Sequence, residues 1–167
     1  MSDTGEASSE DLKARVLDIL ARHRTMAIAT LRPDGWPQAT IVGYANDDLD
    51  LYFVISSSSQ KRDNILRDRR VSIAIGGDPP EGEPIVGLSM AATVAPVSDP
   101  AEVERLNELV ARRYPEHARF SPGAQSVTVM KAVPEVISLV DSTARGARAQ
   151  LVQVLHEAVL RLLPSKT

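Results

Sequence analysis

Residues 56–64, with the sequence Ser-Ser-Ser-Ser-Gln-Lys-Arg-Asp-Asn, carry side chains suited to holding an anion. They follow an alternating apolar run, residues 49–55, and lead into a segment that we expect to be helical over about 60–67. Free N–H groups at a helix start favour an anion, Lys61 adds a full positive charge, and the serine hydroxyls add donors. The stretch therefore predicts a phosphate-binding site. A serine N-cap followed by a solvated run of charges accounts for the same residues, so both interpretations stay open here.

The common catalytic motifs are absent from the sequence. The histidines, His23, His117 and His156, lie far apart and lack the spacing of metal ligands. There are no cysteines, which excludes disulfides, thiolate catalysis and cysteine metal sites. There is no Gly-x-Ser-x-Gly elbow, no Walker loop and no Gly-x-Gly-x-x-Gly motif after a strand. If the protein is an enzyme, a bound cofactor would therefore supply the chemistry.

The composition is that of an ordinary globular protein. The 167 residues fit one domain, which we expect over residues 10–167 after a disordered tail at 1–9. The net charge of -3 and the pI of about 5.6 argue against a nucleic-acid-binding surface, and 4% aromatic residues offer few stacking platforms. The start is polar and acidic, unlike a signal peptide, and no apolar run has the length of a membrane span. We therefore expect a cytoplasmic location.

Most of the chain alternates with the period of β-strands. We expect strands at 25–31, 37–45, 49–55, 71–75, 85–97, 126–132 and 135–141. The first connections are short and polar, with Arg32-Pro33-Asp34-Gly35 in one and Asn46-Asp47-Asp48 in the next. Short connections favour antiparallel pairing. The expected fold class is mainly β with flanking helices, arranged as a closed or nearly closed antiparallel barrel.

Helices are expected around these strands. The first should cover about 10–24 with a serine cap, and another should start after Asp99-Pro100 and run to about Tyr114. The last is expected over 145–163, where Leu151, Leu155 and other apolar residues repeat at heptad-like spacing. Its broad apolar stripe could pack on a partner subunit or lie against its own barrel.

Small residues recur on several of the expected strands. They are Ala27 and Ala29, Ala39 and Gly43, and Gly87, Ser89 and Ala91. They could leave a flat slot near the phosphate site, or they could allow tight packing of the sheet.

Several short motifs, in order, resemble one known family. They are Arg-Pro-Asp-Gly at 32–35, Pro-Gln-Ala-Thr at 37–40, Leu-Tyr-Phe at 51–53, Ser-Gln-Lys at 59–61 with Asn64, Arg-Val-Ser at 70–72, Gly-Leu-Ser-Met at 87–90 and Pro-Glu-Val-Ile-Ser at 134–138. Together they are similar to the pyridoxamine 5'-phosphate oxidase-like, FMN-binding split-barrel family over about residues 10–145. The resemblance implies a six-stranded antiparallel split barrel that forms a homodimer with two FMN molecules at the interface.

The resemblance also implies which residues touch the cofactor. The strand at 39–43 would run beside the flavin, the end of the next strand would follow the ribityl chain, and the serine-rich stretch would hold the phosphate. The implied cofactor-binding residues are Ala39, Thr40, Ile41, Val42, Val54, Ile55, Ser59, Gln60, Lys61, Asn64 and Ser89. Ser89 would approach the flavin from the long strand, in the partner's site.

The sequence departs from the family pattern at two places. Gln60 stands where an arginine often precedes the phosphate-binding lysine, so one positive charge is missing. Residues 141–148 lack the aromatic residue and the histidine that similar chains carry there. We therefore expect an FMN-dependent oxidoreductase that acts on an unidentified small molecule other than pyridoxamine 5'-phosphate. The alternatives are a deazaflavin-dependent reductase, for which Lys61 and Arg62 could hold the anionic tail, and a flavin- or haem-binding protein without turnover.

Overall fold

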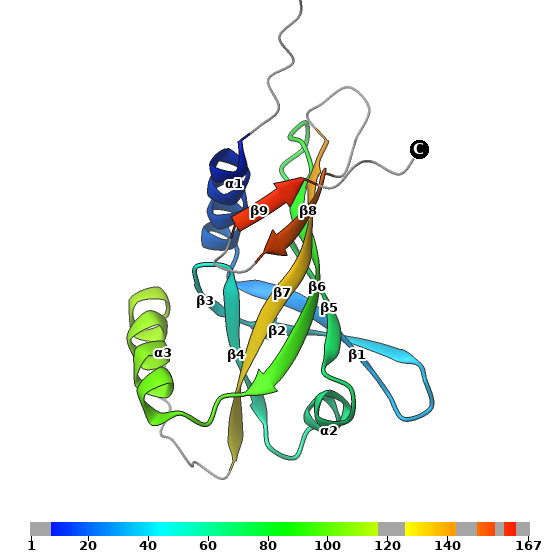
Figure 1. Cartoon of the computed structure of the whole chain (residues 1–167), viewed down its shortest axis with the longest axis vertical. Coiled ribbons are helices and arrows are strands. Elements are labelled where there is room, and N and C mark those ends of the chain that lie inside the picture. The colour runs from blue at the N-terminus through cyan, green and yellow to red at the C-terminus, as the bar shows by residue number, and fades with distance from the viewer. Residues whose placement is uncertain (1–7, 117–125, 143–149, 156–158, 163–167) are drawn as a thin grey trace, which may run out of the picture.

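A single antiparallel sheet curls round to enclose the core of the protein (Figure 1). The computed structural model describes residues 8–116, 126–142, 150–155 and 159–162. The sheet contains β1 (Thr25–Leu31), β2 (Pro37–Gly43), β3 (Ala45–Asp47), β4 (Asp50–Ser56), β5 (Arg70–Gly76), β6 (Val86–Pro96), β7 (Val127–Asp141), β8 (Gln150–Leu155) and β9 (Val159–Leu162). Its main path runs β2-β1-β5-β6-β7-β4-β3, and β8 and β9 extend from β7. The mainly β, split-barrel prediction is confirmed.

The strands bury one face because their apolar residues alternate. On β5, Val71, Ile73 and Ile75 are buried between exposed neighbours, and β1 and β6 follow the same pattern. Helix α1 (Ser9–Arg22) packs Leu12 and its other buried apolar residues onto this core. Ser8 caps it, so the predicted helix is right to within two residues at each end. The rest of the predicted tail lies outside the described residues. None of the described helices is long and apolar enough to cross a membrane.

Two strand boundaries differ from the prediction. The segment expected as one strand over 37–45 is divided at Tyr44 into β2, which pairs with β1, and β3, which pairs with β4. In contrast, the two strands expected at 126–132 and 135–141 are one strand, β7. Pro134 lies inside β7, where the register to β6 shifts between Ala91 and Ala92. A proline cannot donate to the ladder, and a bulge accommodates it without ending the strand.

The predicted C-terminal helix is wrong. The described parts of 145–163 form β8 and β9, an antiparallel pair. β4 pairs with the first half of β7 but leaves Val136–Leu139 free, and β8 pairs with these residues instead. This open edge offers backbone hydrogen bonds to residues 150–155. The β-branched residues Val152, Val154 and Val159 also favour an extended conformation. The heptad-like spacing therefore did not indicate a helix here.

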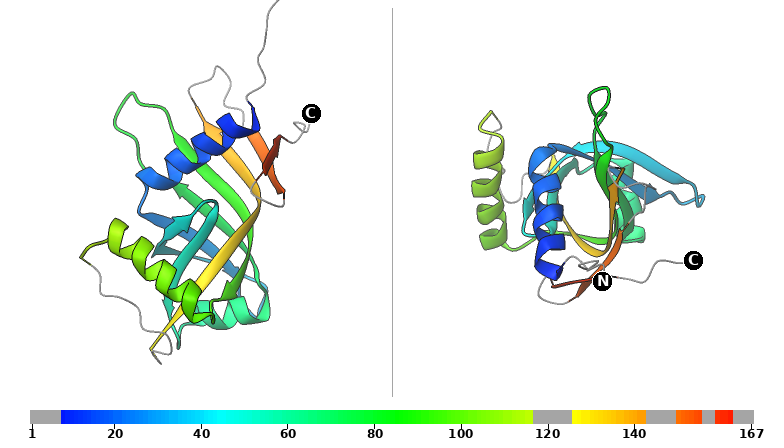
Figure 2. Two further views of the ribbon diagram at one scale, coloured as in Figure 1. Left: turned by 60° about the vertical axis from the view of Figure 1, so that its left-hand side comes forward. Right: turned by 90° about the horizontal axis from the view of Figure 1, so that it is seen from above.

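Helix α3 (Pro100–Arg113) stands to one side of the barrel (Figures 1 and 2). It covers a second, smaller core that includes Tyr52 and Val129 of the barrel and Leu106 of the helix. The Tyr52 hydroxyl donates a hydrogen bond of 2.8 Å to Glu102, which also forms an ion pair of 3.2 Å with Lys131. These contacts fix the start of α3 against β4 and β7.

Candidate cofactor-binding site

The serine-rich stretch forms the connection from β4 to helix α2 (Gln60–Arg67), as predicted. Ser59 is the N-cap, and its Oγ accepts a hydrogen bond of 3.3 Å from the Arg62 N–H. Ser57 Oγ lies 3.0 Å from Thr128 Oγ1, and Ser56 Oγ lies 3.0 Å from Ser58 Oγ. The serines thus also shape the loop that leads into the helix, and the capping interpretation is correct for Ser59.

Lys61 is a half-buried cation in the first turn of α2. Burial lowers the pKa of its ammonium group below the ordinary lysine value. Among the described residues, none forms an ion pair or a hydrogen bond with this side chain. A desolvated cation near a helix start, where the backbone also carries partial positive charge, is stabilised by an anion. Lys61 is therefore the strongest indication of an anion site.

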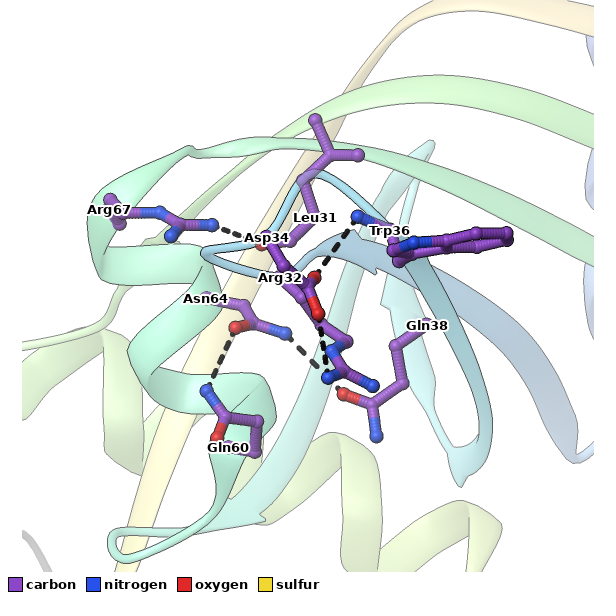
Figure 3. A network of polar contacts seen from close by, with 8 residues as sticks. All are labelled: Leu31, Arg32, Asp34, Trp36, Gln38, Gln60, Asn64 and Arg67. Atoms are coloured by element: carbon purple, nitrogen blue, oxygen red, sulfur yellow. Dashed lines mark hydrogen bonds and ion pairs between the residues drawn. The ribbon is translucent and has the colours of Figure 1, made fainter.

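Asn64 connects α2 to the first hairpin of the barrel. Its side chain is only 1% exposed, and its Oδ1 accepts a hydrogen bond of 3.0 Å from Gln60. Its Nδ2 donates to Thr30 Oγ1 at 3.1 Å and to Gln38 Oε1 at 3.5 Å (Figure 3). The Arg67 guanidinium also donates to the Leu31 carbonyl at 2.7 Å. The start of α2 and β1–β2 are thereby held in a fixed relation.

Thr40 carries a buried hydroxyl for which the described residues provide no hydrogen-bond partner. It lies on the face of β2 that also presents Gln38 to Asn64 and Val42 to the core. A buried hydroxyl without a partner typically costs about 1–3 kcal/mol. The orphaned oxygen is thus a candidate contact for a bound ligand, and it belongs to the predicted set.

Replacing Thr40 tests whether this hydroxyl lacks a partner. Thr40→Val removes the polar group and nearly keeps the shape, so we expect it to raise the free energy of unfolding of the ligand-free protein by about 1 kcal/mol. Urea denaturation measures the change. Thr30→Val is the matched control and should destabilise the protein, because Thr30 Oγ1 accepts the hydrogen bond from Asn64. A Thr40→Val variant that is less stable than wild type would show that the hydroxyl is satisfied.

An apolar cavity of about 180 Å³ lies beyond the far end of β2, between the middle of β4 and helix α3. It is lined by Gly43, Tyr44, Ala45, Tyr52, Phe53, Val54, Leu106, Val110 and Tyr114. Burial raises the pKa of Tyr44 to about 12, and its hydroxyl donates to the Leu20 carbonyl at 2.8 Å. Tyr44 therefore stays neutral at physiological pH, and the cavity suits an apolar or aromatic group. Of the predicted cofactor-binding residues, Val54 lines it, as does Gly43 at the end of the strand predicted to run beside the flavin. The contribution of α3 was missed because it depends on tertiary packing.

The predicted residues fall on two faces of the sheet. Gln60, Lys61, Asn64 and Thr40 cluster around the start of α2 and the inner face of β2. Ile55 is buried in the core, so only its backbone is available to a ligand. Ala39, Ile41 and Ser89 are exposed on the outer face, where Ile41 and Ser89 line a separate cleft of about 420 Å³. One protomer therefore does not bring Ser89 to the anion site.

These features define a class: a split barrel with an anion site at one end of an edge strand and an apolar cavity at the other. The profile of pyridoxamine 5'-phosphate oxidase matches residues 12–141. The chain belongs to this family.

Individual relatives agree with this assignment. General stress protein 26 of Bacillus subtilis is 30% identical over 71 residues, which are 42% of this chain and 50% of that protein. The chain thus spans about half the length of this curated relative. The structure of a candidate pyridoxamine 5'-phosphate oxidase of Listeria innocua is 26% identical, with a TM-score of 0.63 over 77% of this chain and 97% of that one.

The same fold also occurs in a heme binding protein of Mycobacterium smegmatis. That structure is 20% identical, with a TM-score of 0.69 over 84% of this chain and 56% of that one. At this identity the likeness shows the fold alone. Membership of the family therefore does not distinguish flavin from haem, and the cofactor has to be inferred from the residues of the site.

Proposed function

We propose that the protein binds FMN along β2 and β4 and acts as an oxidoreductase on an unidentified small molecule. The observation that carries the proposal is Lys61, a half-buried ammonium group that lacks an anionic partner among the described residues and lies at the start of α2. A phosphate monoester would supply the missing negative charge. The orphaned hydroxyl of Thr40 is a second group whose hydrogen-bonding capacity a ligand would satisfy.

The arrangement fits a ligand with a phosphate at one end and an aromatic ring at the other. Ser59 and Lys61 would hold the phosphate, and the apolar cavity beside Val54 is suited to aromatic groups. The backbone groups of Ala39, Thr40, Ile41 and Val42 would position the ring and exclude water from one side. When bound, FMN would supply the redox chemistry by accepting or donating a hydride. We assign no acid or base of the chain to the reaction.

The substrate is proposed to differ from pyridoxamine 5'-phosphate. The reason is the altered sequence of residues 141–148, most of which lie outside the described residues. Cytoplasmic location is part of the same proposal.

The absorption spectrum of freshly purified protein, with mass spectrometry of the released ligand, tests the choice of cofactor. Two flavin bands and the mass of FMN would support the proposal. A single band in the violet with the mass of a deazaflavin would show that the cofactor is a deazaflavin. A Soret band would show that it is haem. A colourless protein that does not take up FMN on reconstitution would refute it.

We also propose that the functional unit is a homodimer formed through the outer face of the sheet. Ile41, Ala27, Ala74 and Ser89 are successive neighbours across β2, β1, β5 and β6 and line the 420 Å³ cleft. Small side chains allow close approach of a second copy, while Ile41 and Ile85 leave 69% and 57% of their surface exposed. In an isologous contact, Ser89 of each copy would lie against the outer face of the partner, where the predicted residues Ala39 and Ile41 are also exposed. This face replaces the predicted helix as the reason for a dimer.

Sedimentation at micromolar concentration should show a dimer for the wild type. Ala74→Glu puts like charges on both copies of the interface, so the dissociation constant of the dimer should rise by at least ~100-fold. Ala111→Glu adds the same charge at an exposed position of α3 and should leave the dimer intact. A wild-type monomer that binds FMN tightly would contradict the shared site.

A further inference from the structure

A polar cleft separates the β1–β2 turn from the start of α2. It has a volume of about 460 Å³ and is lined by Arg32, Pro33, Asp34, Gln38 and Gln60. Gly35, with a φ of 84°, closes the turn by donating its N–H to the Arg32 carbonyl at 2.9 Å. The cleft thus joins a tight turn to the helix start that carries Lys61.

The hydrogen bonds around this cleft leave donors directed toward it. Asn64 uses the Gln38 carbonyl oxygen as an acceptor, so the Gln38 amide nitrogen remains able to donate. The Arg32 guanidinium lies beside the Gln38 amide and forms one ion pair of 2.8 Å, with Asp34 (Figure 3). A guanidinium has five N–H donors, so an anion could bind Arg32 while part of the Asp34 contact remains.

The charge at the anion site is incomplete. A phosphate monoester carries close to two negative charges at neutral pH, whereas Lys61 supplies one positive charge. Position 60 adds none, because glutamine is neutral, and its amide already donates to Asn64. Arg67, at the end of α2, is engaged with the Leu31 carbonyl. Arg62, in the first turn of α2, forms an ion pair of 3.7 Å with Asp63, and its Nε is buried. Arg32 faces Gln60 across the cleft and is a further cation whose position allows it to add the missing charge.

We propose that Arg32 supplies the second positive charge for the phosphate of the bound cofactor and that Asp34 competes for it. This inference rests on the proposed binding of FMN and goes beyond it, because it assigns phosphate recognition to a turn outside the serine-rich stretch. In the absence of the phosphate, the ion pair with Asp34 holds Arg32 in place. When the phosphate binds, the guanidinium divides its donors between the two anions.

Titration of the apo-protein with FMN and with riboflavin, which lacks the phosphate, tests the proposal. The single tryptophan, Trp36, follows the turn and provides the fluorescence signal. Arg32→Ala should weaken FMN binding about 3- to 10-fold, a modest factor because the side chain is half exposed, and should leave riboflavin binding unchanged. Arg32→Lys should recover part of the loss. Asp34→Asn should tighten FMN binding about 2-fold, because the amide still accepts from the Trp36 N–H but no longer competes for Arg32.

Arg22→Ala is the matched control, since Arg22 forms an exposed ion pair with Asp18 on α1, and it should change neither affinity. If Arg32→Ala weakens FMN and riboflavin equally, Arg32 only supports the hairpin and the proposal is wrong. If it changes neither, the phosphate does not reach the cleft and the proposal is equally wrong. A wild-type protein that binds neither flavin would refute the proposed function, and this inference with it. If the wild type binds FMN and the Arg32→Ala variant binds it with the same affinity, the proposed function stands and only this inference is refuted.

Discussion

Lys61→Ala is expected to weaken FMN binding by at least ~10-fold and to leave riboflavin binding nearly unchanged. Removing one partner of a desolvated, hydrogen-bonded charge pair typically costs about 2–5 kcal/mol, and about 1.4 kcal/mol corresponds to a factor of ten. Lys61 is only half buried, so we expect a loss near the lower end of this range. Titration of the apo-protein with both flavins measures the difference. Lys61→Arg should restore part of the affinity, because the charge is kept while its geometry changes.

Stability provides an internal control for this variant. Because burial lowers the pKa of Lys61 in the folded state, the unfolded chain binds more protons at pH values between the lowered and the ordinary lysine pKa. The charged lysine therefore opposes folding, and its contribution becomes more favourable as the pH rises through the lowered pKa. Lys61→Ala should consequently leave the free energy of unfolding unchanged or slightly raised. If the variant loses affinity for both flavins equally, the serine-rich stretch is only a helix cap.

Asn64→Ala should cause the largest loss of stability among these variants, about 2–4 kcal/mol. The substitution removes a buried side chain and leaves the hydroxyl of Thr30 and the amide of Gln60 without their partner. Urea denaturation measures this loss, and the slope of the free energy of unfolding against urea concentration should stay unchanged. Arg22→Ala is the control: its side chain is exposed on α1 and lies outside this network, so we expect a change below about 1 kcal/mol.

Measuring FMN binding by the Asn64→Ala variant shows whether Asn64 supports the structure of the site or contacts the phosphate directly. Because Asn64 joins α2 to β1–β2, its loss should weaken the binding of FMN and riboflavin together. This outcome differs from that of Lys61→Ala, which should act on FMN alone. A stability change within about 0.5 kcal/mol would show that the Asn64 network is not formed in solution.

The barrel could be predicted from the sequence because its signals are local. Alternation placed β5 and β6 to within a residue or two, and α2 was predicted at its observed bounds. The C-terminal segment could not be predicted in this way. Its apolar residues satisfy a helical and an extended pattern, and the free edge of β7 decided between them. Periodicity contains no information about which backbone edges remain unpaired.

The candidate site was predicted only in part for the same reason. Lys61 and Asn64 follow from a strand, a serine cap and a helix that are adjacent in the chain. The unpaired hydroxyl of Thr40, the cavity under α3 and the approach of Arg32 to Gln60 require pairing between distant segments. Nothing at these positions in the sequence distinguishes them from ordinary strand, helix and turn residues.

The central position of β7 has a consequence for how the chain folds during synthesis. β7 lies between β6 and β4, so β4 and β3 join the rest of the sheet through a strand that begins at Val127. Until the ribosome has released that segment, β6 and β4 both present unpaired edges. The barrel can close only after β7 has been synthesised, through contacts between residues far apart in sequence, which is a slow class of folding step. Nascent chains that stall before β7 should therefore be the forms of this protein most dependent on chaperones.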